Sequence, residues 1–299
     1  MKILIALRHY RISGVVTWSN VTARALASLG HEVHVWFRDR ETNDMSMVAK
    51  FFEYKVFLGD CPQDDYDLAL CNYTDLADAC MRVAKRTHFI KHGTMFDLYK
   101  PPEGVDTVVC LSGRSYELEP SENKVLVENY IEDDIVVRRR ASNPATRALI
   151  CDIRSMYDWQ PVVLLLESMG IDCHELTQLT NPQGVPHIQK HFDSYDIVVG
   201  YGRVVREAML AGRHVWVHGA NGGCGFITAD TYNAAHYRNF SGWVLNNKES
   251  IEQASSYLSD ISTPCKLGES QCNWNRSKAL EELVVSSKHL ETLIKGCES

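Results

Sequence analysis

Glycines, an arginine and a glutamate lie close together in one stretch of the chain. It reads "GYGRVVREAMLAG", with Gly200 and Gly202 around an aromatic residue, then Arg203, and Glu207 four residues further on. The preceding apolar run "YDIVVG" indicates that a buried strand turns into a helix here. Glycines let a ligand approach the backbone closely, and the first turn of a helix offers unpaired amides to an anion. A phosphate fits this turn, and Arg203 adds positive charge to it.

Glu207 is expected about one turn inside the predicted helix. A carboxylate at that depth can accept hydrogen bonds from the paired hydroxyls of a ribose. The stretch is therefore interpreted as a site for a nucleotide diphosphate. The structural alternative is that the turn and the glutamate serve only the fold, since Gly-rich turns and first-turn glutamates also occur for that reason.

The elements that must position these residues follow from an alternation of strand-like and helical patterns. Strands are predicted at 2–7, 31–37, 55–59, 66–71, 88–93, 106–112, 124–131, 147–153, 171–179, 195–200 and 214–219, with a shorter strand-like run at 242–245. Helices are predicted at 17–29, 75–86, 158–169, 203–212, 249–259 and 276–295. Such alternation implies parallel sheets with helices on both faces. The predicted fold class is α/β, with two doubly wound, Rossmann-like domains whose ligand crevices face a central cleft.

The alternation pauses at "EDDIVVRRRASNPAT", which is charged, polar and proline-bearing and therefore a candidate domain boundary. We expect an N-terminal domain over 1–140 and a C-terminal domain over 141–275. A final helical segment, 276–299, could cross back to the first domain.

Composition excludes several classes of protein. The chain has 299 residues and a formal charge of −7, which argues against a uniformly basic surface for nucleic acid but permits a local basic cleft. Its ten cysteines are scattered without a Cys-x-x-Cys pair, which is typical of reduced thiols in a cytoplasmic protein. No signal peptide or membrane span is expected. No Gly-x-Gly-x-x-Gly or P-loop pattern occurs, and "HEVH" is too short for a zinc-protease motif, so no metal and no redox cofactor are expected.

The stretch "VGYGRVVREAMLAGRHVWV" resembles the C-terminal domain of retaining GT-B glycosyltransferases, particularly the family 4 group. In that family a Glu precedes Gly-Phe-Gly, and a second Glu precedes Ala-Met-Ala-x-Gly-x-Pro-Val. The second Glu, which holds the nucleotide ribose in the family, falls on Glu207, and the glycine turn falls on Gly200 and Gly202. The first Glu, which contacts the transferred hexose, falls on Val199, and the usual proline is His214.

Further matches extend this resemblance over most of the chain. "NGGCG" resembles the family's second glycine loop, beside the donor sugar and phosphates, and places Gly222 and Gly223 there. "RISGVV" resembles the glycine loop after the first strand and sets Gly14 against the diphosphate. "ALICDIRS" gives Arg154 a diphosphate role, and "HFIKHG" places His92 near the reacting sugar. The structural alternatives are a surface-loop arginine, a cleft-edge histidine and a turn glycine.

The resemblance implies a retaining, metal-independent glycosyltransferase in which His92, Arg154 and Arg203 act as catalytic residues. Its donor would be a nucleotide diphosphate-sugar, with a UDP-sugar favoured. The resemblance implies that the C-terminal domain, 141–275, binds this nucleotide-sugar and that the N-terminal domain, 1–140, lies on the acceptor side. Because Val199 cannot accept hydrogen bonds from a hexose, the sugar could be a pentose.

The acceptor is expected to be a soluble molecule. Compact GT-B enzymes include viral enzymes that glycosylate hydroxymethylated DNA bases, so DNA is a candidate partner and the host cytoplasm a candidate location. Arg8, Arg11, Arg38 and Arg40 follow N-domain strands and could line a phosphate-binding rim. A polysaccharide or small-molecule glycosyltransferase, a nucleotide-sugar epimerase and a noncatalytic sugar-nucleotide-binding module remain alternatives.

Overall fold

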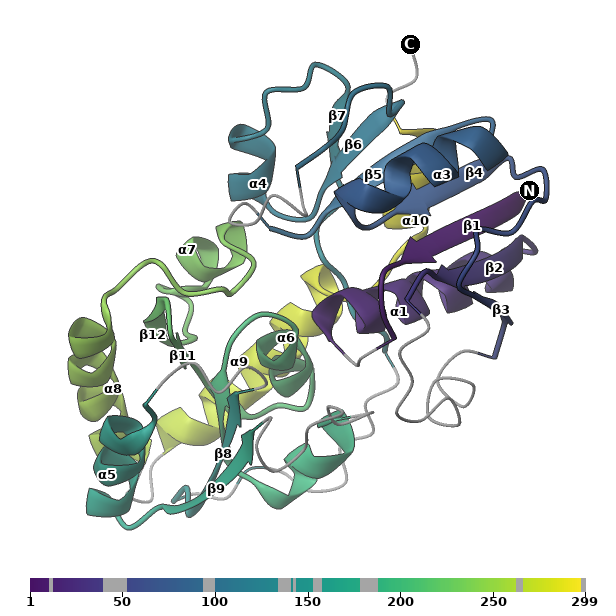
Figure 1. The fold of residues 1–299 in the computed structure, drawn as a ribbon. Coiled ribbons are helices and arrows are strands. Elements are labelled where there is room, and N and C mark those ends of the chain that lie inside the picture. Colours follow the sequence, from purple (N-terminus) through teal and green to yellow (C-terminus); the bar gives the residue numbers. More distant parts are fainter. Residues whose placement is uncertain are drawn as a thin grey trace. The chain divides into compact units, whose positions relative to one another are not determined.

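The computed structural model describes residues 1–10, 13–39, 53–93, 100–133, 141, 144–152, 158–177, 188–261 and 266–296. The chain divides into two compact units (Figure 1). The first unit is Met1–Tyr130 together with Val285–Ser299, and the second unit is Ile131–Val284. The chain thus leaves its first unit at Tyr130, whereas the sequence indicated a boundary near residue 140, and the last fifteen residues group with the N-terminal part.

A seven-stranded parallel sheet forms the centre of the first unit. Its strand order is β3-β2-β1-β4-β5-β6-β7. The strands are β1 (Lys2–Leu7), β2 (Glu32–Phe37), β3 (Lys55–Leu58), β4 (Leu68–Cys71), β5 (Thr87–Lys91), β6 (Thr107–Cys110) and β7 (Lys124–Leu126). The order reverses between β1 and β4, so the carboxyl ends of these two strands form the switch point at which doubly wound sheets bind ligands.

Helices cover both faces of this sheet, as the alternation within β1 requires. Ile3 and Ile5 belong to the apolar cluster that includes α1 (Gly14–Ser28) and α10 (Ser287–Lys295). Leu4 and Ala6 belong to the cluster on the opposite face, with α3 (Ala77–Val83) and the short helix η1 (Thr74–Leu76). One further short helix, α4 (Gly113–Glu117), follows β6. Both faces of a parallel sheet are buried in this way.

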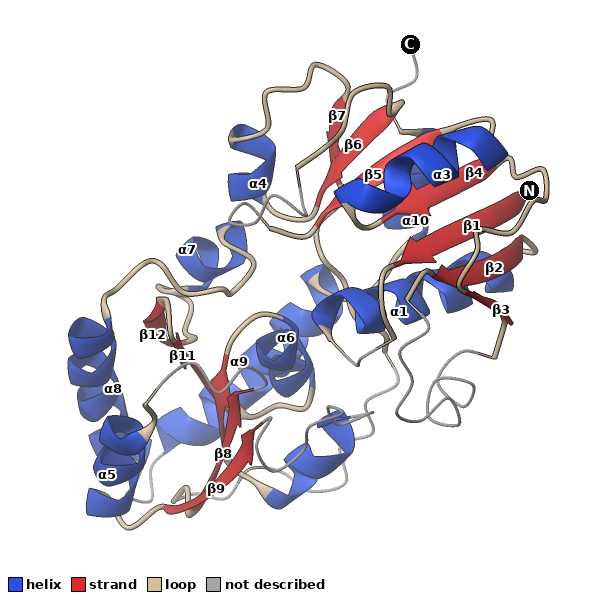
Figure 2. Cartoon of the chain, in the orientation of Figure 1, coloured by secondary structure: helices blue, strands red, loops and turns tan. Residues whose placement is uncertain are grey.

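The second unit contains a five-stranded sheet in the order β12-β11-β10-β8-β9. Figure 2 labels four of its strands, β8, β9, β11 and β12. Its strands are β8 (Arg147–Asp152), β9 (Asp172–Thr177), β10 (Ile197–Gly200), β11 (His214–Gly219) and β12 (Gly222–Phe226). All neighbours are parallel except β11 and β12, which form an antiparallel hairpin. The chain passes from β8 to β9 on one side and to β10 on the other, so the switch point lies between β8 and β10.

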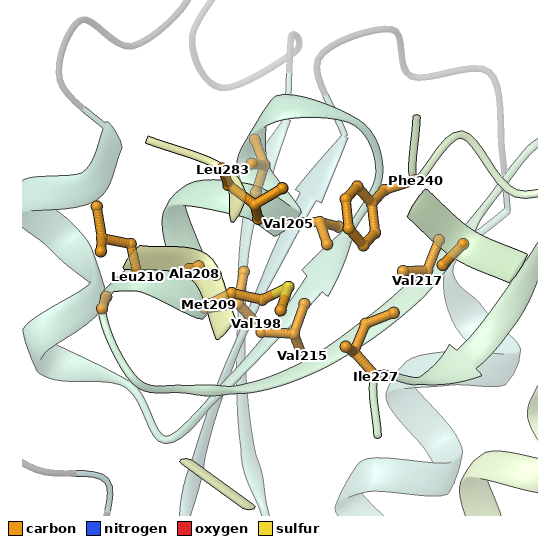
Figure 3. Close-up of a cluster of buried hydrophobic side chains, with 14 of the residues drawn as sticks. Val198, Val205, Ala208, Met209, Leu210, Val215, Val217, Ile227, Phe240 and Leu283 are labelled. Atoms are coloured by element: carbon orange, nitrogen blue, oxygen red, sulfur yellow. The ribbon is translucent and has the colours of Figure 1, made fainter. Parts of the chain in front are cut away.

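Six helices are described in the second unit. They are α5 (Gln160–Ser168), η3 (Ile188–Ser194), α6 (Arg203–Leu210), α7 (Tyr232–Tyr237), α8 (Asn247–Ile261) and α9 (Lys266–Glu282). Val162 of α5 and Leu258 of α8 pack on one face of the sheet. On the other face α6 packs through Val205, Ala208 and Met209 onto β10 and β11, with α9 beside it (Figure 3).

The α/β, doubly wound fold class is confirmed, but three local predictions were wrong. The predicted strand-like run 242–245 is not a strand, because it forms only an isolated antiparallel bridge between Leu245 and Gly223. The predicted helix 276–295 is two helices, α9 and α10, which separate around Val284 and Val285. The stretch "NGGCG" is not a loop, because Gly222–Phe226 is the strand β12. Within the described ranges, no helix has both the length and the apolar character that crossing a bilayer demands.

Candidate functional site

The switch point of the second unit brings together the ends of β8 and β10 and the start of α6. A Cβ atom added to Gly200 would lie 3.2 Å from the carbonyl oxygen of Cys151, the penultimate residue of β8. Glu207 also lies near Cys151. Burial raises the pKa of the Cys151 thiol, and the negative charge of Glu207 raises this pKa further. Gly200 and Glu207 therefore both lie at the carboxyl end of β8, where the sheet order predicts a ligand site.

Gly202 makes the turn from β10 into α6. Its φ of 66° lies in the left-handed region, where a side chain would be strained. Its amide donates to the carbonyl oxygen of Phe240 at 2.7 Å, so this amide is already engaged. Anion binding by backbone amides at this turn would therefore fall to the first residues of α6.

Arg203 and Glu207, one helical turn apart on α6, form an ion pair. Arg203 Nε lies 2.7 Å from Glu207 Oε1, and the two side chains are 12% and 7% exposed. The sequence assigned one residue to the diphosphate and the other to the ribose; the structure brings the two together.

A buried arginine that the sequence did not single out supports the start of α6. Arg206, 1% exposed, donates from Nη2 to Asn239 Oδ1 at 2.8 Å, and its guanidinium carbon lies 4.8 Å from the centre of the Phe240 ring. Asn239 and Phe240 both have left-handed backbones, with φ of 57° and 53°. Such conformations persist where surrounding contacts enforce them. Since these residues are 33 positions apart in the chain, helix periodicity could not reveal their pairing.

Gly222 and Gly223 are buried in β12, where neighbouring backbone leaves no room for side chains. The Gly223 amide donates to Leu245 O at 2.9 Å, and its carbonyl oxygen accepts from the Leu245 amide at 2.9 Å. A Cβ on Gly223 would collide with Ser250 Oγ and with the carbonyl oxygen of Val217. The fold itself therefore requires Gly223, and its amide is engaged. The sequence-based donor role of these glycines stays a prediction.

Val199, at the position of the family's hexose-binding glutamate, is fully buried. It belongs to an apolar cluster with Ile150, Trp159 and Trp216 on the α5 and α8 face of the sheet, opposite to α6. Its neighbours are therefore core side chains. His214, which replaces the family's proline, starts β11 and bonds Tyr257 OH through Nδ1 at 3.0 Å.

In the first unit, His92 follows β5 at the carboxyl edge of the sheet. His92 Nε2 lies 2.7 Å from Oδ1 of Asn72, which follows β4, and the imidazole meets the Trp18 ring edge-on at 5.4 Å between centroids. Burial lowers the pKa of His92 to about 3, so the ring is neutral near pH 7. The structure thus places His92 beside the switch point of its own sheet.

Gly14 begins α1, one turn before Trp18. Ser13 caps this helix, since its hydroxyl accepts from the Val16 amide at 3.4 Å. A Cβ added to Gly14 would meet no atom within 4 Å, so the described fold does not require a glycine at this position. Arg154, the remaining predicted site residue, lies outside the described residues.

Two of the four arginines proposed as a phosphate-binding rim carry acidic partners. Arg38 Nη1 lies 2.7 Å from Asp75 Oδ2 and its Nε 3.0 Å from Asp39 Oδ1. Arg8 Nε lies 3.6 Å from Asp39 Oδ2 and 3.8 Å from Asp75 Oδ2. The two positive and two negative charges balance. Arg11 and Arg40 lie outside the described residues.

Among the residues that the structure describes, no three His, Cys, Asp or Glu side chains are placed so that they could share a metal ion. The metal-independent mechanism that the resemblance implies remains a prediction.

Comparison of sequences gives no match: neither a protein-family profile nor a curated protein corresponds to this chain. Solved structures, in contrast, match over almost the full length of both chains. HepE of Anabaena, in complex with UDP-glucose, has a TM-score of 0.63 at 12% identity and covers 98% of this chain and 99% of its own.

An alpha-glucosyltransferase in complex with UDP and a 13-mer DNA containing an HMU base has a TM-score of 0.65 at 10% identity, covering 99% of this chain and 98% of its own. WaaG, a glycosyltransferase involved in lipopolysaccharide biosynthesis, has a TM-score of 0.60 at 11% identity, and the match covers all of both chains. Together with the two doubly wound sheets, these similarities show that the chain has the GT-B fold, as its sequence predicted.

Proposed function

We propose that the protein is a glycosyltransferase that takes its sugar from a UDP-sugar. The observation that carries this proposal is the position of Glu207: a buried carboxylate one turn into α6, at the β8/β10 switch point, beside a glycine turn. A carboxylate there suits the paired hydroxyls of a ribose. The similar structures include a complex with UDP-glucose and a complex with UDP, which supports the choice of nucleotide.

The second unit would hold the nucleotide. The amides of the first turn of α6 and the Arg154 guanidinium would stabilise the negative charge that develops on the departing diphosphate. His92, to which the resemblance gives a catalytic role, would act as a neutral hydrogen-bonding group, because burial lowers its pKa to about 3. In this proposal no metal is needed, and the product keeps the anomeric configuration of the donor, as the resemblance implies. Activity that survives EDTA and an α-linked product from an α-linked donor are the expected results.

A thermal-shift screen tests the donor site directly. UDP and UDP-sugars should raise the unfolding temperature of the wild-type protein, and Glu207→Gln should weaken UDP binding by about 1–3 kcal/mol, the scale of a charge-assisted hydrogen bond. Glu252→Gln is the matched control, because Glu252 belongs to an exposed helical ion pair with Lys248. The proposal fails if no nucleotide stabilises the wild type, or if both variants bind UDP as the wild type does.

Mass spectrometry with unlabelled acceptors then distinguishes sugar transfer from epimerisation and from binding without turnover. A glycosyltransferase adds the mass of a sugar to an acceptor, an epimerase converts the sugar nucleotide without one, and a binding module does neither. UDP-xylose and UDP-arabinose should be compared with UDP-glucose and UDP-N-acetylglucosamine, because Val199 replaces the hexose-binding glutamate. Since Val199 is enclosed by core side chains, a preference for a pentose would have to arise from other residues.

For the acceptor we propose DNA that carries a hydroxymethylated base. This choice is supported by the similarity to the alpha-glucosyltransferase complex with DNA. Because Arg8 and Arg38 are balanced by Asp39 and Asp75, the phosphate contacts must come mainly from other basic residues. Duplexes with and without hydroxymethyluracil or hydroxymethylcytosine should be offered beside oligosaccharides and small alcohols. Sugar transfer to oligosaccharides alone would overturn the DNA assignment.

A further inference from the structure

We propose that Arg203 is a positioning residue that orients the carboxylate of Glu207 toward the donor ribose, and that it is not a direct ligand of the diphosphate. This inference rests on the proposed function, which assigns the ribose to Glu207. The sequence assigned Arg203 to the diphosphate. In this proposal Arg203 instead affects binding of the nucleoside part of the donor, through Glu207.

The contact itself is specific in geometry. Arg203 uses Nε, the nitrogen nearest its aliphatic stem, and meets Glu207 Oε1 at 2.7 Å, the distance of a charge-assisted hydrogen bond. Both residues are on α6 at i and i+4, so the helix backbone brings their side chains within reach of each other. The guanidinium is therefore held along the helix toward Glu207.

Burial distinguishes the Arg203–Glu207 ion pair from exposed ion pairs. The Glu207 side chain is only 7% exposed, and a carboxylate removed from water needs a charged or hydrogen-bonding partner to stay ionised. The pair Lys248–Glu252 on α8 has the same i, i+4 spacing, but its side chains are 86% and 63% exposed and 3.7 Å apart. An exposed pair of that kind contributes little to either side chain's orientation. The comparison separates the effect of burial from that of spacing.

The ion pair with Arg203 is compatible with ligand binding by the same carboxylate. An ionised carboxylate offers about four lone-pair positions, so it can accept the Arg203 Nε–H together with other hydrogen bonds. With one oxygen fixed by Arg203, the plane of the carboxylate is fixed as well, which pre-organises it for two neighbouring hydroxyls. Ribose recognition is then expected to depend on both residues as one unit.

Binding of uridine and of UDP, measured side by side, tests the proposal. The variants are Arg203→Gln, Arg203→Lys, Glu207→Gln and the double variant Arg203→Gln/Glu207→Gln, with Lys248→Gln as the matched control. Calorimetry suits UDP, and ligand-observed NMR suits the weaker uridine. Arg203→Gln should weaken uridine and UDP by the same factor, about tenfold, and the double variant should bind no more weakly than Glu207→Gln alone. Arg203→Lys should also weaken both, because a lysine lacks the Nε–H that makes the contact.

The opposite pattern would overturn the proposal. A direct diphosphate ligand would make Arg203→Gln weaken UDP while leaving uridine unchanged, and its effect would add to that of Glu207→Gln. If Arg203→Gln does not fold, Arg203→Lys keeps the buried charge and gives the same comparison of uridine with UDP. Failure of the wild type to bind either molecule would instead overturn the proposed function, so the two failures are distinguishable.

Discussion

Asn72 fixes the hydrogen-bonding state of His92. Asn72 Nδ2 donates to the carbonyl oxygen of Ala6 at 3.1 Å, which turns Oδ1 toward the imidazole, and His92 Nε2 lies 2.7 Å from that oxygen. The ring must therefore present an N–H at Nε2, and in the neutral ring Nδ1 is then the acceptor. Because burial holds the pKa of His92 at about 3, the residue serves as a neutral hydrogen-bonding group and not as an acid near pH 7.

Asn72→Asp should raise the pKa of His92. A carboxylate at the position of Oδ1 favours the charged imidazolium, an effect of about one pKa unit or more for a neighbour in contact. The C2 proton of His92, followed by NMR from about pH 3 to 8, measures it without any substrate. His88, which bonds Leu293 O through Nδ1, is the internal control and should keep its pKa. An unchanged titration of His92 in this variant would contradict the hydrogen bond.

Gly14→Ala should leave the fold intact and reduce activity. A Cβ at this position meets nothing within 4 Å, and alanine at the start of a helix lowers the entropy of the unfolded chain, so stability should stay equal or rise by up to about 1 kcal/mol. If the donor diphosphate approaches the backbone here, the added methyl group should raise KM for the donor. Chemical unfolding and donor kinetics on the same preparation measure both effects. Unaltered kinetics would leave Gly14 as a turn residue and remove it from the site.

Gly223→Ala should have the reverse effect and destabilise the second unit. The new methyl group would press on the carbonyl oxygen of Val217 and on Ser250 Oγ, and the expected cost of such overpacking is about 1–3 kcal/mol. Gly14→Ala provides the matched control for a glycine in open space. A Gly223→Ala protein of wild-type stability with lost donor binding would instead favour the role assigned from the resemblance.

The strands and the first turn of the site were predictable from sequence because both depend on local patterns. Buried parallel strands are short apolar runs, and the spacing of Gly200, Gly202 and Glu207 follows directly from a strand, a turn and a helix. The contact between Arg203 and Glu207 also has a local signal, their i, i+4 spacing. The sequence pattern did not indicate that Arg203 and Glu207 are buried, whereas Lys248 and Glu252, at the same spacing, are exposed.

Features that depend on tertiary packing were missed. β12 has three glycines in five residues, a composition that disfavours strands, and it is a strand because Gly222 and Gly223 pack against the segment that enters α8. The break between α9 and α10 had a signal: Ser286 caps α10 and forms a capping box with His289. The pairing of Asn72 with His92 had none, since it depends on β4 and β5 being neighbours in the sheet.

Acid should destabilise the second unit through histidines whose pKa burial lowers to about 4, namely His236 and the more deeply buried His214 and His218. His214 and His218 are 2% and 0% exposed, and burial lowers the pKa of each to about 4 from 6.5. Since the unfolded chain binds these protons near pH 6.5 and the folded chain only near pH 4, the free energy of unfolding falls as pH drops through this window. Each proton contributes a slope of up to about 1.4 kcal/mol per pH unit, and none contributes above about pH 7.5.

Guanidinium unfolding at about pH 7.5, 6.5, 5.5 and 4.5 measures this slope. His214→Gln, which can still bond Tyr257 OH, should lower the slope by about one proton while reducing stability at pH 7.5 only slightly. Carboxylates whose pKa is lowered in the folded chain, such as Asp67 and Glu282, add to the slope near pH 4.5, and the difference between the wild type and His214→Gln isolates the histidine from them. A free energy of unfolding that stays constant between pH 7.5 and 4.5 would contradict this prediction. It would mean that His214 and His218 gain water or a charged partner on protonation, although they are buried beneath α8 beside Tyr257 and Ser250.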